Sequence, residues 1–484
     1  MGGMEFAFPY RPYSKEVTEM QVSAYFGMIF LYLVAIVSYG LYIARKKVHT
    51  TDDFVTSGRN LPLWILVGTL IATWYGGGGI TGTANLVYTK GPWAGLLFEF
   101  ASPLAIVIIY FLAAKIRTNK NVTIPELFQE KYGSAARILG VIFIVMAYIG
   151  ICSYQFKGAG YVLNLTTGIS VELGTMIAAV CIILLSVTGG LLTVAYTDAM
   201  SAIFIFISLI VSVPFLLYTA GGFSGLLSQI PQEKLTLLGG YRPLDTLGYV
   251  LAMLFLTLGD QNLFTRFSAA IDEKVAKKSA LGFIIGSIIL SCLNVFVATV
   301  AIPYLPGIKP DTAFLMVSMK MLPFALGACL LSAAIAFMVT TGDSFLLSSA
   351  TNIFNDIIKP YVKKGLSEKQ GFIVIRLLII FLGIFAYVLI MQFPDILSVM
   401  MYAYTIYGAA ITPALIAALC WKDVTPAGGT ASMIVGGATT LVWEIGLKTK
   451  FDNLNSSFVA IPAAIITLVL VSLLTKRDNC QTGR

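Results

Sequence analysis

The stretch that decides the fold of this chain reads Leu70-Ile71-Ala72-Thr73-Trp74-Tyr75-Gly76-Gly77-Gly78-Gly79-Ile80-Thr81-Gly82. It lies inside an apolar segment, residues 61–88, that is long enough to cross a lipid bilayer. Glycine is about 1 kcal/mol less favourable than alanine in a helix interior. Four consecutive glycines therefore predict a helix that is broken in mid-membrane, where its carbonyls line a cavity or bind an ion. The alternative is a face of small residues that lets two helices pack closely.

The composition of the whole chain is that of a polytopic membrane protein. Of its 484 residues, 57% are hydrophobic and 12% are charged, whereas soluble domains carry about 25% charged residues. The net charge of +8 does not indicate a nucleic-acid partner, because the basic residues fall in short loops between apolar spans. One histidine and six scattered cysteines supply neither a metal cluster nor a disulfide framework. No obligate protein partner is evident.

Apolar runs of about 20 residues predict thirteen spans, at 21–44, 61–88, 91–114, 137–163, 170–189, 192–219, 246–268, 279–304, 321–350, 371–391, 395–420, 426–447 and 457–475. Counting them from zero makes 61–88 span one. Lysine and arginine are concentrated in alternate loops, which marks these loops as cytoplasmic, and Arg45, Lys115, Arg266 and Lys359 are among these residues. The N-terminus is therefore expected outside and the C-terminus in the cytoplasm. A short amphipathic helix is expected at 124–132, on the inner face.

Ionisable residues inside the membrane are costly and indicate function by default. Here they are Glu99, Lys157, Asp198, Asp260 and Asp343. The structural alternative is that charges pair with one another: Asp260 with Lys157, or Glu99 with Lys157.

The most concentrated polar cluster in the spans is Thr340-Thr341-Gly342-Asp343-Ser344. Its side-chain oxygens fall within about one helical turn, and three of them share a face. Oxygen ligands suit hard cations, so carbonyls of Ala72 and Tyr75 would complete a cation site if the broken helix packs beside this cluster. Alternatively, the hydroxyls bond back to their own helix and Asp343 faces the cytoplasmic interface.

A second interruption, Gly259-Asp260-Gln261-Asn262, lies in span six. It comes five spans after the first. Interrupted helices in corresponding positions of two halves indicate an inverted-repeat transporter with a central binding site.

Several spaced motifs make the chain resemble the sodium/solute symporter family, over roughly residues 51–476. They are Thr51-Asp52-Asp53-Phe54 with Ser57-Gly58-Arg59-Asn60-Leu61-Pro62, Thr188-Gly189-Gly190-Leu191 with Ala195-Tyr196-Thr197-Asp198, and Thr340-Thr341-Gly342-Asp343-Ser344 with Ser348-Ser349-Ala350 and Asn355-Asp356. The resemblance implies an all-α polytopic membrane protein with a LeuT-like inverted-repeat fold. Five plus five core helices would belong to about 13 transmembrane helices, and transport would proceed by alternating access.

The implied organisation divides the chain into seven parts. They are an extracellular tail (1–20), a leading helix with its cytoplasmic loop (21–60), the first repeat (61–220), an extracellular loop (221–245), the second repeat (246–421), two peripheral helices (422–476) and a cytoplasmic tail (477–484).

The resemblance also implies two cation sites. The main sodium site would use carbonyls of Ala72, Tyr75 and Phe337 with the hydroxyls of Thr340 and Thr341. A second cation site, present in some family members, would map to Asp198, Thr340, Asp343 and Ser344. Several members carry serine where this chain has Asp343.

Within the family, the first core helix is most similar to the choline-transporter branch. Trp74 fits a cation–π wall for a quaternary amine, but Asp260 stands where that branch has a further tryptophan, so the aromatic cage is incomplete. The residues expected to contact the substrate are Trp74, Tyr75, Gly77, Glu99, Asp260, Gln261 and Asn262.

The sequence thus predicts a multi-pass protein of the plasma (inner) membrane that couples Na+ to the import of a small polar solute. A cationic or zwitterionic solute is favoured: an amine, a choline-like molecule or an amino acid. The alternatives are a sodium-coupled sugar or carboxylate symporter, because Glu99 and Gln261 could bind hydroxyls, and a sodium-independent facilitator or channel on the same scaffold. An enzyme is not expected, since the chain has a lone His49 and no soluble catalytic domain.

Overall fold

The structure is a computed structural model that describes residues 15–47, 59–118, 121, 123–240, 242–362 and 367–481. In these ranges it is a helical bundle without a β-strand, apart from one isolated bridge between Leu61 and Ala270. Among the described residues, twelve helices are long and apolar enough to cross a membrane, and the count is thirteen when the bent pair Leu63–Trp74 and Gly78–Lys90 is taken as one span. The predicted number of spans is confirmed. The expected tail up to residue 14, motif residues 51–58 and residues 482–484 lie outside the described ranges.

The elements of the first half run from the leading helix to the loop before span six. They are α1 (Lys15–Lys47), α3 (Leu63–Trp74), η2 (Gly78–Gly82), α4 (Thr83–Lys90), α5 (Pro92–Thr118), α6 (Ile124–Tyr132), α7 (Ser134–Thr167), α8 (Val171–Thr219), α9 (Gly222–Ser228) and η3 (Gln232–Leu235).

The second half begins with span six and ends near the C-terminus. Its elements are α10 (Pro243–Gly259), α11 (Gln261–Ser268), α12 (Glu273–Tyr304), η4 (Pro310–Thr312), α13 (Ala313–Lys320), α14 (Phe324–Asn352), η5 (Ile353–Ile358), α15 (Lys359–Tyr361), α16 (Glu368–Ile390), α17 (Ile396–Ala410), α18 (Thr412–Cys420), α19 (Pro426–Val442), η6 (Trp443–Leu447), η7 (Lys448–Phe451) and α20 (Ser457–Gln481).

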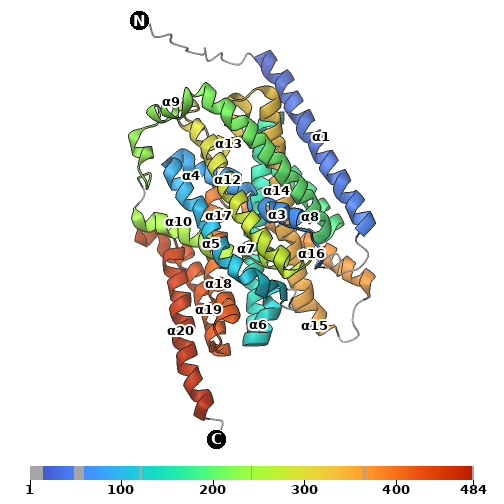
Figure 1. The fold of residues 1–484 in the computed structure, drawn as a ribbon, viewed down its shortest axis with the longest axis vertical. Helices are drawn as coiled ribbons and strands as arrows, with labels where there is room; N and C mark the ends of the chain where they lie inside the picture. Colours follow the sequence, from blue (N-terminus) through green and yellow to red (C-terminus); the bar gives the residue numbers. More distant parts are fainter. Residues whose placement is uncertain are drawn as a thin grey trace.

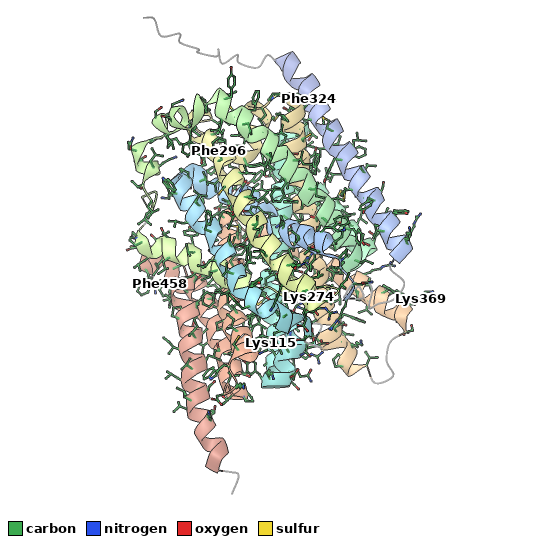
Figure 2. The ribbon with its side chains drawn as sticks, viewed as in Figure 1. Lys115, Lys274, Phe296, Phe324, Lys369 and Phe458 are labelled. Carbon is green, nitrogen blue, oxygen red and sulfur yellow. The ribbon has the colours of Figure 1, made fainter. Side chains whose placement is uncertain are left out.

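The two ends of the bundle differ. Figure 1 shows α6 and α15 at one end, called the inner end below, and α9 at the opposite, outer end. The labelled Lys115, Lys274 and Lys369 lie in the half of the molecule toward the inner end (Figure 2). The inner end is the one predicted to be cytoplasmic, and this sidedness stays a prediction. The short amphipathic helix expected at 124–132 is present as α6, with Thr123 and Glu126 forming its capping box.

Peripheral helices flank a core that contains both broken helices. α1 packs along α8 and α14, whereas α19 and α20 pack on each other and against α17 (Figure 1). Between these layers, α3 contacts α8 and α12, and α10 contacts α5 and α17.

Both predicted interruptions are present. α3 ends at Trp74, the chain resumes as the π-helical turn η2 at Gly78, and the two halves are bent by 52°. The second break falls at Asp260, whose extended backbone (φ −63°, ψ 122°) separates α10 from α11.

A sharp turn also divides α8 at Gly190. This residue has φ 73° and ψ 170°, a conformation that glycine adopts without the strain that a side chain would add. The turn falls at the predicted boundary between the spans 170–189 and 192–219.

The inner ends of the two broken helices are joined by their backbones. The Leu61 amide donates to the carbonyl of Ala269 at 3.0 Å, and the Ile271 amide donates to the carbonyl of Leu61 at 3.3 Å. Arg117 adds a bond from its guanidinium to the carbonyl of Ile271 at 3.0 Å. The entry to α3 and the exit from α11 therefore form one unit, the inner bridge.

Candidate functional site

The break in the first core helix lies directly against α14. The hydroxyl of Thr341 donates to the carbonyl of Ala72 at 3.0 Å. The neighbouring Thr340 hydroxyl is buried and has no hydrogen-bond partner. Neither hydroxyl bonds back to its own helix, so the structural alternative for these two residues is wrong. The packing of the broken helix beside the polar cluster is as predicted.

The glycine run allows this close approach. A Cβ atom at Gly76 would lie 2.5 Å from Thr341 Oγ1 and 2.7 Å from Gln155 Oε1. A Cβ atom at Gly78 would lie 2.8 Å from the hydroxyl of Tyr404 and 2.9 Å from that of Tyr154. The glycines therefore serve both purposes weighed from the sequence, because the helix is broken and its small residues also permit tight packing.

The residues predicted for the main sodium site offer a neutral set of oxygens. Phe337 lies one turn before Thr341 on α14, and Ala72 and Tyr75 lie at the end of α3. All five predicted residues are buried. A carbonyl and a hydroxyl in contact, next to an unpartnered hydroxyl, fit the ligand preference of a hard cation.

Tyr75 and Glu99, both predicted to contact substrate, bind each other. The hydroxyl of Tyr75 donates to Glu99 Oε2 at 2.7 Å, and Ser291 donates to the same oxygen at 3.0 Å. Thr83, the first residue of α4, donates to the other oxygen of Glu99. Tyr75 precedes the turn η2 and Thr83 follows it, so the carboxylate of Glu99 links the two sides of the break.

Asp260 caps the second half-helix. Its Oδ1 accepts from the Leu263 amide at 2.9 Å, and its Oδ2 accepts from the hydroxyl of Tyr148 at 2.9 Å. The alternative pairing of Asp260 or Glu99 with Lys157 is wrong. The Lys157 ammonium instead donates to the carbonyls of Phe393 (2.8 Å) and Pro394 (3.2 Å).

Gln261 and Asn262 lie on the inner side of the second break. The side chain of Gln261 accepts from the Ile124 amide at 3.2 Å and donates to Asn352 at 2.5 Å. The carbonyl oxygen of the Asn262 side chain accepts from Ser348, whereas its amide nitrogen is buried without a partner. Gln261 thus contacts α6 and the inner end of α14, apart from the Ala72–Thr341 contact.

The four residues predicted for a second cation site are buried on α8 and α14. Asp198 and Ser344 both bind the guanidinium of Arg266, at 3.3 and 2.9 Å. Asp343 and Thr340 line a small cavity of about 30 Å³ that α1 and α8 close from the other side. Asp198 Oδ1, Thr340 Oγ1 and Asp343 Oδ1 are buried without a hydrogen-bond partner, and the second cation site stays a prediction.

Arg266 is the largest departure from the sequence prediction, which placed it in a cytoplasmic loop. Its side chain is fully buried in the bundle. One feature of the sequence did indicate burial: Arg266 falls within the predicted range of span six, 246–268. In the sequence, a basic residue so close to the end of a span resembles a loop residue. Its buried partner, Asp198 on α8, is distant in sequence and could not be recognised.

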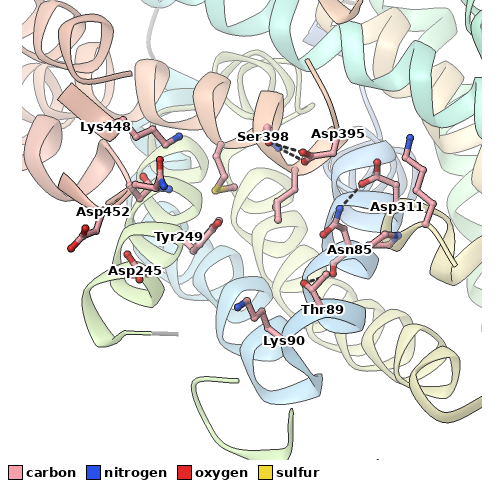
Figure 3. A pocket seen from close by; sticks show the side chains of 16 residues that line it. Asn85, Thr89, Lys90, Asp245, Tyr249, Asp311, Asp395, Ser398, Lys448 and Asp452 are labelled. Carbon is pink, nitrogen blue, oxygen red and sulfur yellow. Dashed lines mark hydrogen bonds between the residues drawn. The ribbon is translucent and has the colours of Figure 1, made fainter. Parts of the chain in front are cut away.

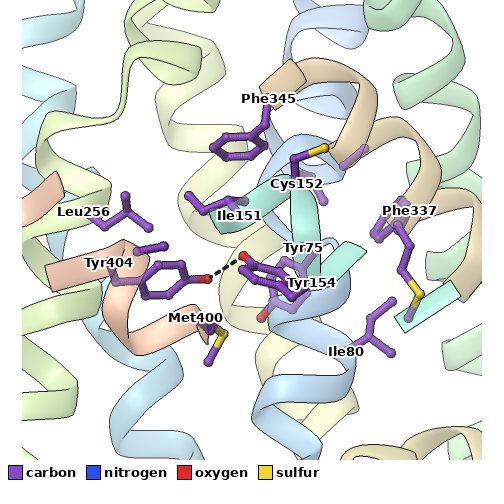
Figure 4. Packing of buried hydrophobic residues seen from close by; sticks show 14 of the residues in the cluster. Tyr75, Ile80, Ile151, Cys152, Tyr154, Leu256, Phe337, Phe345, Met400 and Tyr404 are labelled. Atoms are coloured by element: carbon purple, nitrogen blue, oxygen red, sulfur yellow. Dashed lines mark hydrogen bonds between the residues drawn. The ribbon is translucent and has the colours of Figure 1, made fainter. Parts of the chain in front are cut away.

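Three further residues at the first break were not predicted. The amide of Gly77 donates to Gln155 Oε1 at 2.5 Å, while Gln155 Nε2 is buried without a partner. Tyr154 and Tyr404 approach each other with their hydroxyls 3.3 Å apart beside Gly78 (Figure 4). Their side chains are aromatic and buried, so periodicity alone cannot distinguish them from core residues.

At the outer end, a cavity of about 590 Å³ opens next to α4, η4 and α17 (Figure 3). Its wall includes Asp311, whose carboxylate is buried. This carboxylate accepts from Asn85 at 2.7 Å, from Tyr161 at 3.3 Å and from the Ile396 amide at 3.4 Å. The outer half of the first broken helix is thereby tied to α7 and to the start of α17.

Solved structures share the overall fold of this chain. A Na+-coupled sialic acid symporter in a substrate-bound, outward-open state has a TM-score of 0.77 at 16% identity, covering 92% of this chain and 98% of that one. MhsT in complex with L-phenylalanine has a TM-score of 0.53 at 15% identity, covering 84% of this chain and 98% of that one. These likenesses establish the LeuT-like fold.

Relatives in sequence span nearly the whole chain. The osmoregulated proline transporter OpuE of Bacillus subtilis is 24% identical over 92% of this chain and 94% of its own length. Sodium/proline symporter 2 of Staphylococcus saprophyticus is 25% identical over 93% of each chain. The sequence model of the sodium:solute symporter family matches residues 54–436. The chain belongs to the sodium:solute symporter family, and it is a membrane transporter of a small solute rather than an enzyme.

Proposed function

We propose that the chain imports a small zwitterionic amino acid, as compact as proline, together with sodium ions. The observation that carries the sodium part is the contact of Thr341 with the Ala72 carbonyl beside the unpartnered hydroxyl of Thr340. A cation held by these oxygens would draw the broken helix against α14. Sodium binding would thereby shape the adjoining substrate site, which is the physical basis of coupling.

The proposed substrate follows from the unpaired polar groups near the glycine run. Gln155 Nε2 is a buried donor without a partner, and Asn294 Oδ1 is a buried acceptor without a partner. The side chain of Asn294 also donates to the Gly79 carbonyl at 2.5 Å, which fixes it at the break. One donor and one acceptor suit the carboxylate and the ammonium group of a zwitterion, and a buried polar group gains most from such a partner.

The same site offers apolar surface beside these polar groups. Tyr154, Tyr404 and Met400 all approach Gly78, and their side chains lie together near Tyr75 in Figure 4. Rings and a thioether suit a compact aliphatic side chain. The printed names of the relatives point to the same substrate class, since several are proline transporters.

A purely cationic substrate such as choline has less support. It would need a free carboxylate or an aromatic cage, but both oxygens of Asp260 already accept hydrogen bonds. Trp74, Tyr75, Gly77 and Asp260 remain part of the proposal as residues around the substrate.

The remaining parts of the proposal concern organisation. Helices of the repeats 61–220 and 246–421 would together surround the central site, which would open to the two sides of the membrane in turn. The loop 221–245 would lie outside and the helices 422–476 at the periphery. The N-terminus would be outside and the C-terminus cytoplasmic in the plasma (inner) membrane.

Uptake of radiolabelled L-proline into proteoliposomes tests the proposal. Proline should accumulate when sodium is directed inward and should not accumulate when potassium replaces sodium. Unlabelled L-proline should compete at least tenfold better than choline, galactose or acetate, with D-proline as the matched control for shape. Equal, non-concentrative flux with and without the sodium gradient would instead establish a facilitator, and stronger competition by choline or a sugar would exclude the amino acid.

A further inference from the structure

Glu99 is a buried carboxylate that the main sodium site does not include. It lies on α5 with 1% of its surface exposed, and an ionisable residue inside a membrane span indicates function by default. Its Oε2 accepts from the hydroxyls of Tyr75 at 2.7 Å and Ser291 at 3.0 Å, and its Oε1 accepts from the hydroxyl of Thr83. Both oxygens are therefore engaged by the protein itself, which argues against direct contact with the ammonium group of a substrate.

The ring of Tyr75 passes across the first break to reach this carboxylate. A Cβ atom at Gly79 would lie 2.8 Å from Cδ1 of Tyr75, so the ring fills the space that a side chain at residue 79 would need. The hydroxyl of Tyr75 then meets Glu99 together with the hydroxyl of Thr83, which follows the turn η2. The ring and the carboxylate therefore bracket the π-helical turn from both of its ends.

α12 fastens this arrangement to the bundle. Ser291 binds Glu99, and Asn294, three residues later on the same helix, donates to the carbonyl of Gly79 at 2.5 Å. The hydroxyls of Ser291 and Tyr75 also contact each other. Residues three apart share a face of a helix, so α12 presents a polar face to the break. The side chain of Tyr75 cannot shift without the loss of several hydrogen bonds at once.

The backbone of Tyr75, in turn, belongs to the predicted sodium site. Tyr75 is the C-terminal cap of α3, with φ −87° and ψ 13°, and its amide donates to the carbonyl of Ile71 at 3.0 Å. Carbonyls in the last turn of a helix have no partner within that helix. Because the helix ends at this point, no following turn of α3 fixes the carbonyl of Tyr75. Its direction therefore depends on how the side chain of Tyr75 is anchored.

We infer that Glu99 is a positioning residue for sodium binding: it anchors the side chain of Tyr75 and thereby sets the direction of the Tyr75 carbonyl, without contacting sodium or substrate itself. This inference rests on the proposed sodium-coupled function and deepens it. Ligands bind tightly when other residues hold them in place beforehand. The groups proposed to face the substrate, on Gln155 and Asn294, have separate anchors on the glycine run. Loss of Glu99 should therefore weaken sodium binding selectively.

Sodium activation of L-proline uptake into proteoliposomes tests the inference. Tyr75→Phe removes only the hydroxyl that reaches Glu99 and keeps both the ring and the carbonyl. The sodium concentration for half-maximal uptake should rise about fivefold, the size expected for one lost hydrogen bond, whereas the KM for proline at saturating sodium should not change. Unchanged sodium activation would overturn the inference. A raised KM for proline at saturating sodium would overturn it as well, because the clamp would then act on the substrate.

Substitutions of Glu99 itself show whether it acts through Tyr75. Glu99→Ala should raise the half-maximal sodium concentration more than Tyr75→Phe does, and Glu99→Gln, which keeps one acceptor oxygen, should fall between Glu99→Ala and the wild type. The double variant Glu99→Ala/Tyr75→Phe should be no worse than Glu99→Ala. Independent, additive effects of the two substitutions would contradict a role through Tyr75.

Ser102→Ala is the matched control. Ser102 lies on α5 three residues after Glu99, is equally buried, and its hydroxyl has no hydrogen-bond partner. Its loss should leave the sodium activation curve unchanged. An equal rise of the half-maximal sodium concentration in Ser102→Ala and Tyr75→Phe would overturn the inference, because any change in the packing of α5 would then have the same effect.

Thermal stabilisation of the purified protein by sodium, with potassium as control, covers variants that do not transport. The sodium concentration at the midpoint of stabilisation should be raised in Tyr75→Phe and raised further in Glu99→Ala. A lower unfolding temperature with an unchanged midpoint would show a merely structural role and overturn the inference, and Tyr75→Phe decides if Glu99→Ala does not fold. A wild-type protein without sodium-dependent uptake or stabilisation would reject the proposed function itself, whereas unchanged variants of a sodium-dependent wild type reject the inference alone.

Discussion

Two buried carboxylates, one at each end of the first broken helix, are satisfied in different ways. At the inner end, Asp198 binds Thr69 and Thr73 of α3 and pairs with the guanidinium of Arg266. At the outer end, Asp311 binds Asn85 of α4 through neutral donors and lies in the wall of the 590 Å³ cavity. The inner contact is ionic and fully buried, whereas the outer contact uses neutral donors and lies beside a cavity.

This difference indicates which end of the molecule opens at the lower cost. Separating a buried ion pair leaves an unpaired charge in low dielectric, whereas the donors around Asp311 can exchange for water in the adjoining cavity. The inner end is the tightly closed one in this structure. An ion pair at one end and neutral hydrogen bonds at the other also mean that substitutions should act unequally at the two ends.

The largest effect is expected from Arg266→Ala. Removing one partner of a buried ion pair costs about 3–5 kcal/mol, because Asp198 is left charged and unpaired. The thermal unfolding temperature of the detergent-purified protein should fall strongly. The double variant Arg266→Ala/Asp198→Asn should recover much of the loss, and equal stabilities for the single and double variants would contradict an ionic inner contact.

Gly76→Ala should have the next largest effect. Its added Cβ would lie 2.5 Å from Thr341 Oγ1 and 2.7 Å from Gln155 Oε1, and overpacking of this kind costs about 1–3 kcal/mol. Sodium-driven uptake should be severely reduced, since the break could no longer approach α14. Gly27→Ala is a matched control, because a Cβ atom there meets nothing within 4 Å; equal losses in both variants would argue against close approach as the cause.

A smaller, more specific effect is expected from Thr341→Ala. Loss of one hydroxyl ligand should weaken sodium binding by about tenfold, corresponding to roughly 1.4 kcal/mol, in the range of a hydrogen bond to a charged group. The sodium concentration for half-maximal uptake should rise accordingly, while Thr341→Ser should behave like the wild type. An unchanged sodium activation curve in Thr341→Ala would remove Thr341 from the sodium site.

The smallest effect is expected at the outer end, from Asp311→Asn. Burial raises the pKa of the Asp311 carboxyl above its ordinary value of 3.8, so the folded protein favours the neutral form. The contribution of this carboxyl to folding stability is complete below pH 3.8 and is lost as the pH rises through the folded-state pKa. Asp311→Asn should therefore reduce the fall in thermal unfolding temperature as the pH rises from 3.8 through the folded-state pKa of Asp311. Asp452→Asn, at the same cavity but not among the charges that shift the pKa of Asp311, is the control and should retain the slope.

Much of the fold could be predicted from the sequence, because its determinants are local. A run of glycines in an apolar span and the Asp-Gln-Asn group five spans later predict two broken helices without reference to any contact. The cluster of hydroxyls at residues 340–344 likewise predicted the helix that meets the first break. In lipid, unsatisfied backbone and side-chain polar groups are costly enough that such local exceptions carry a structural meaning.

The partners of the buried charges could not be predicted in the same way. Arg266 and Asp198 are 68 residues apart, and Glu99 is satisfied by hydroxyls from three helices, which composition does not distinguish from other serines, threonines and tyrosines. Gln155 resembles an ordinary polar residue in α7 until the fold brings it to the amide of Gly77. Pairings of this kind depend on tertiary packing, which a single sequence does not contain.

The inner bridge has a consequence for leakage. Because Leu61 is hydrogen-bonded to both Ala269 and Ile271, the start of α3 cannot swing outward while the end of α11 stays behind, unless two backbone bonds are exchanged for water. The inner ends of the two half-helices, α3 and α11, are therefore held together through Leu61. We expect the inner ends of the two half-helices to open together, which would keep an uncoupled leak of ions small.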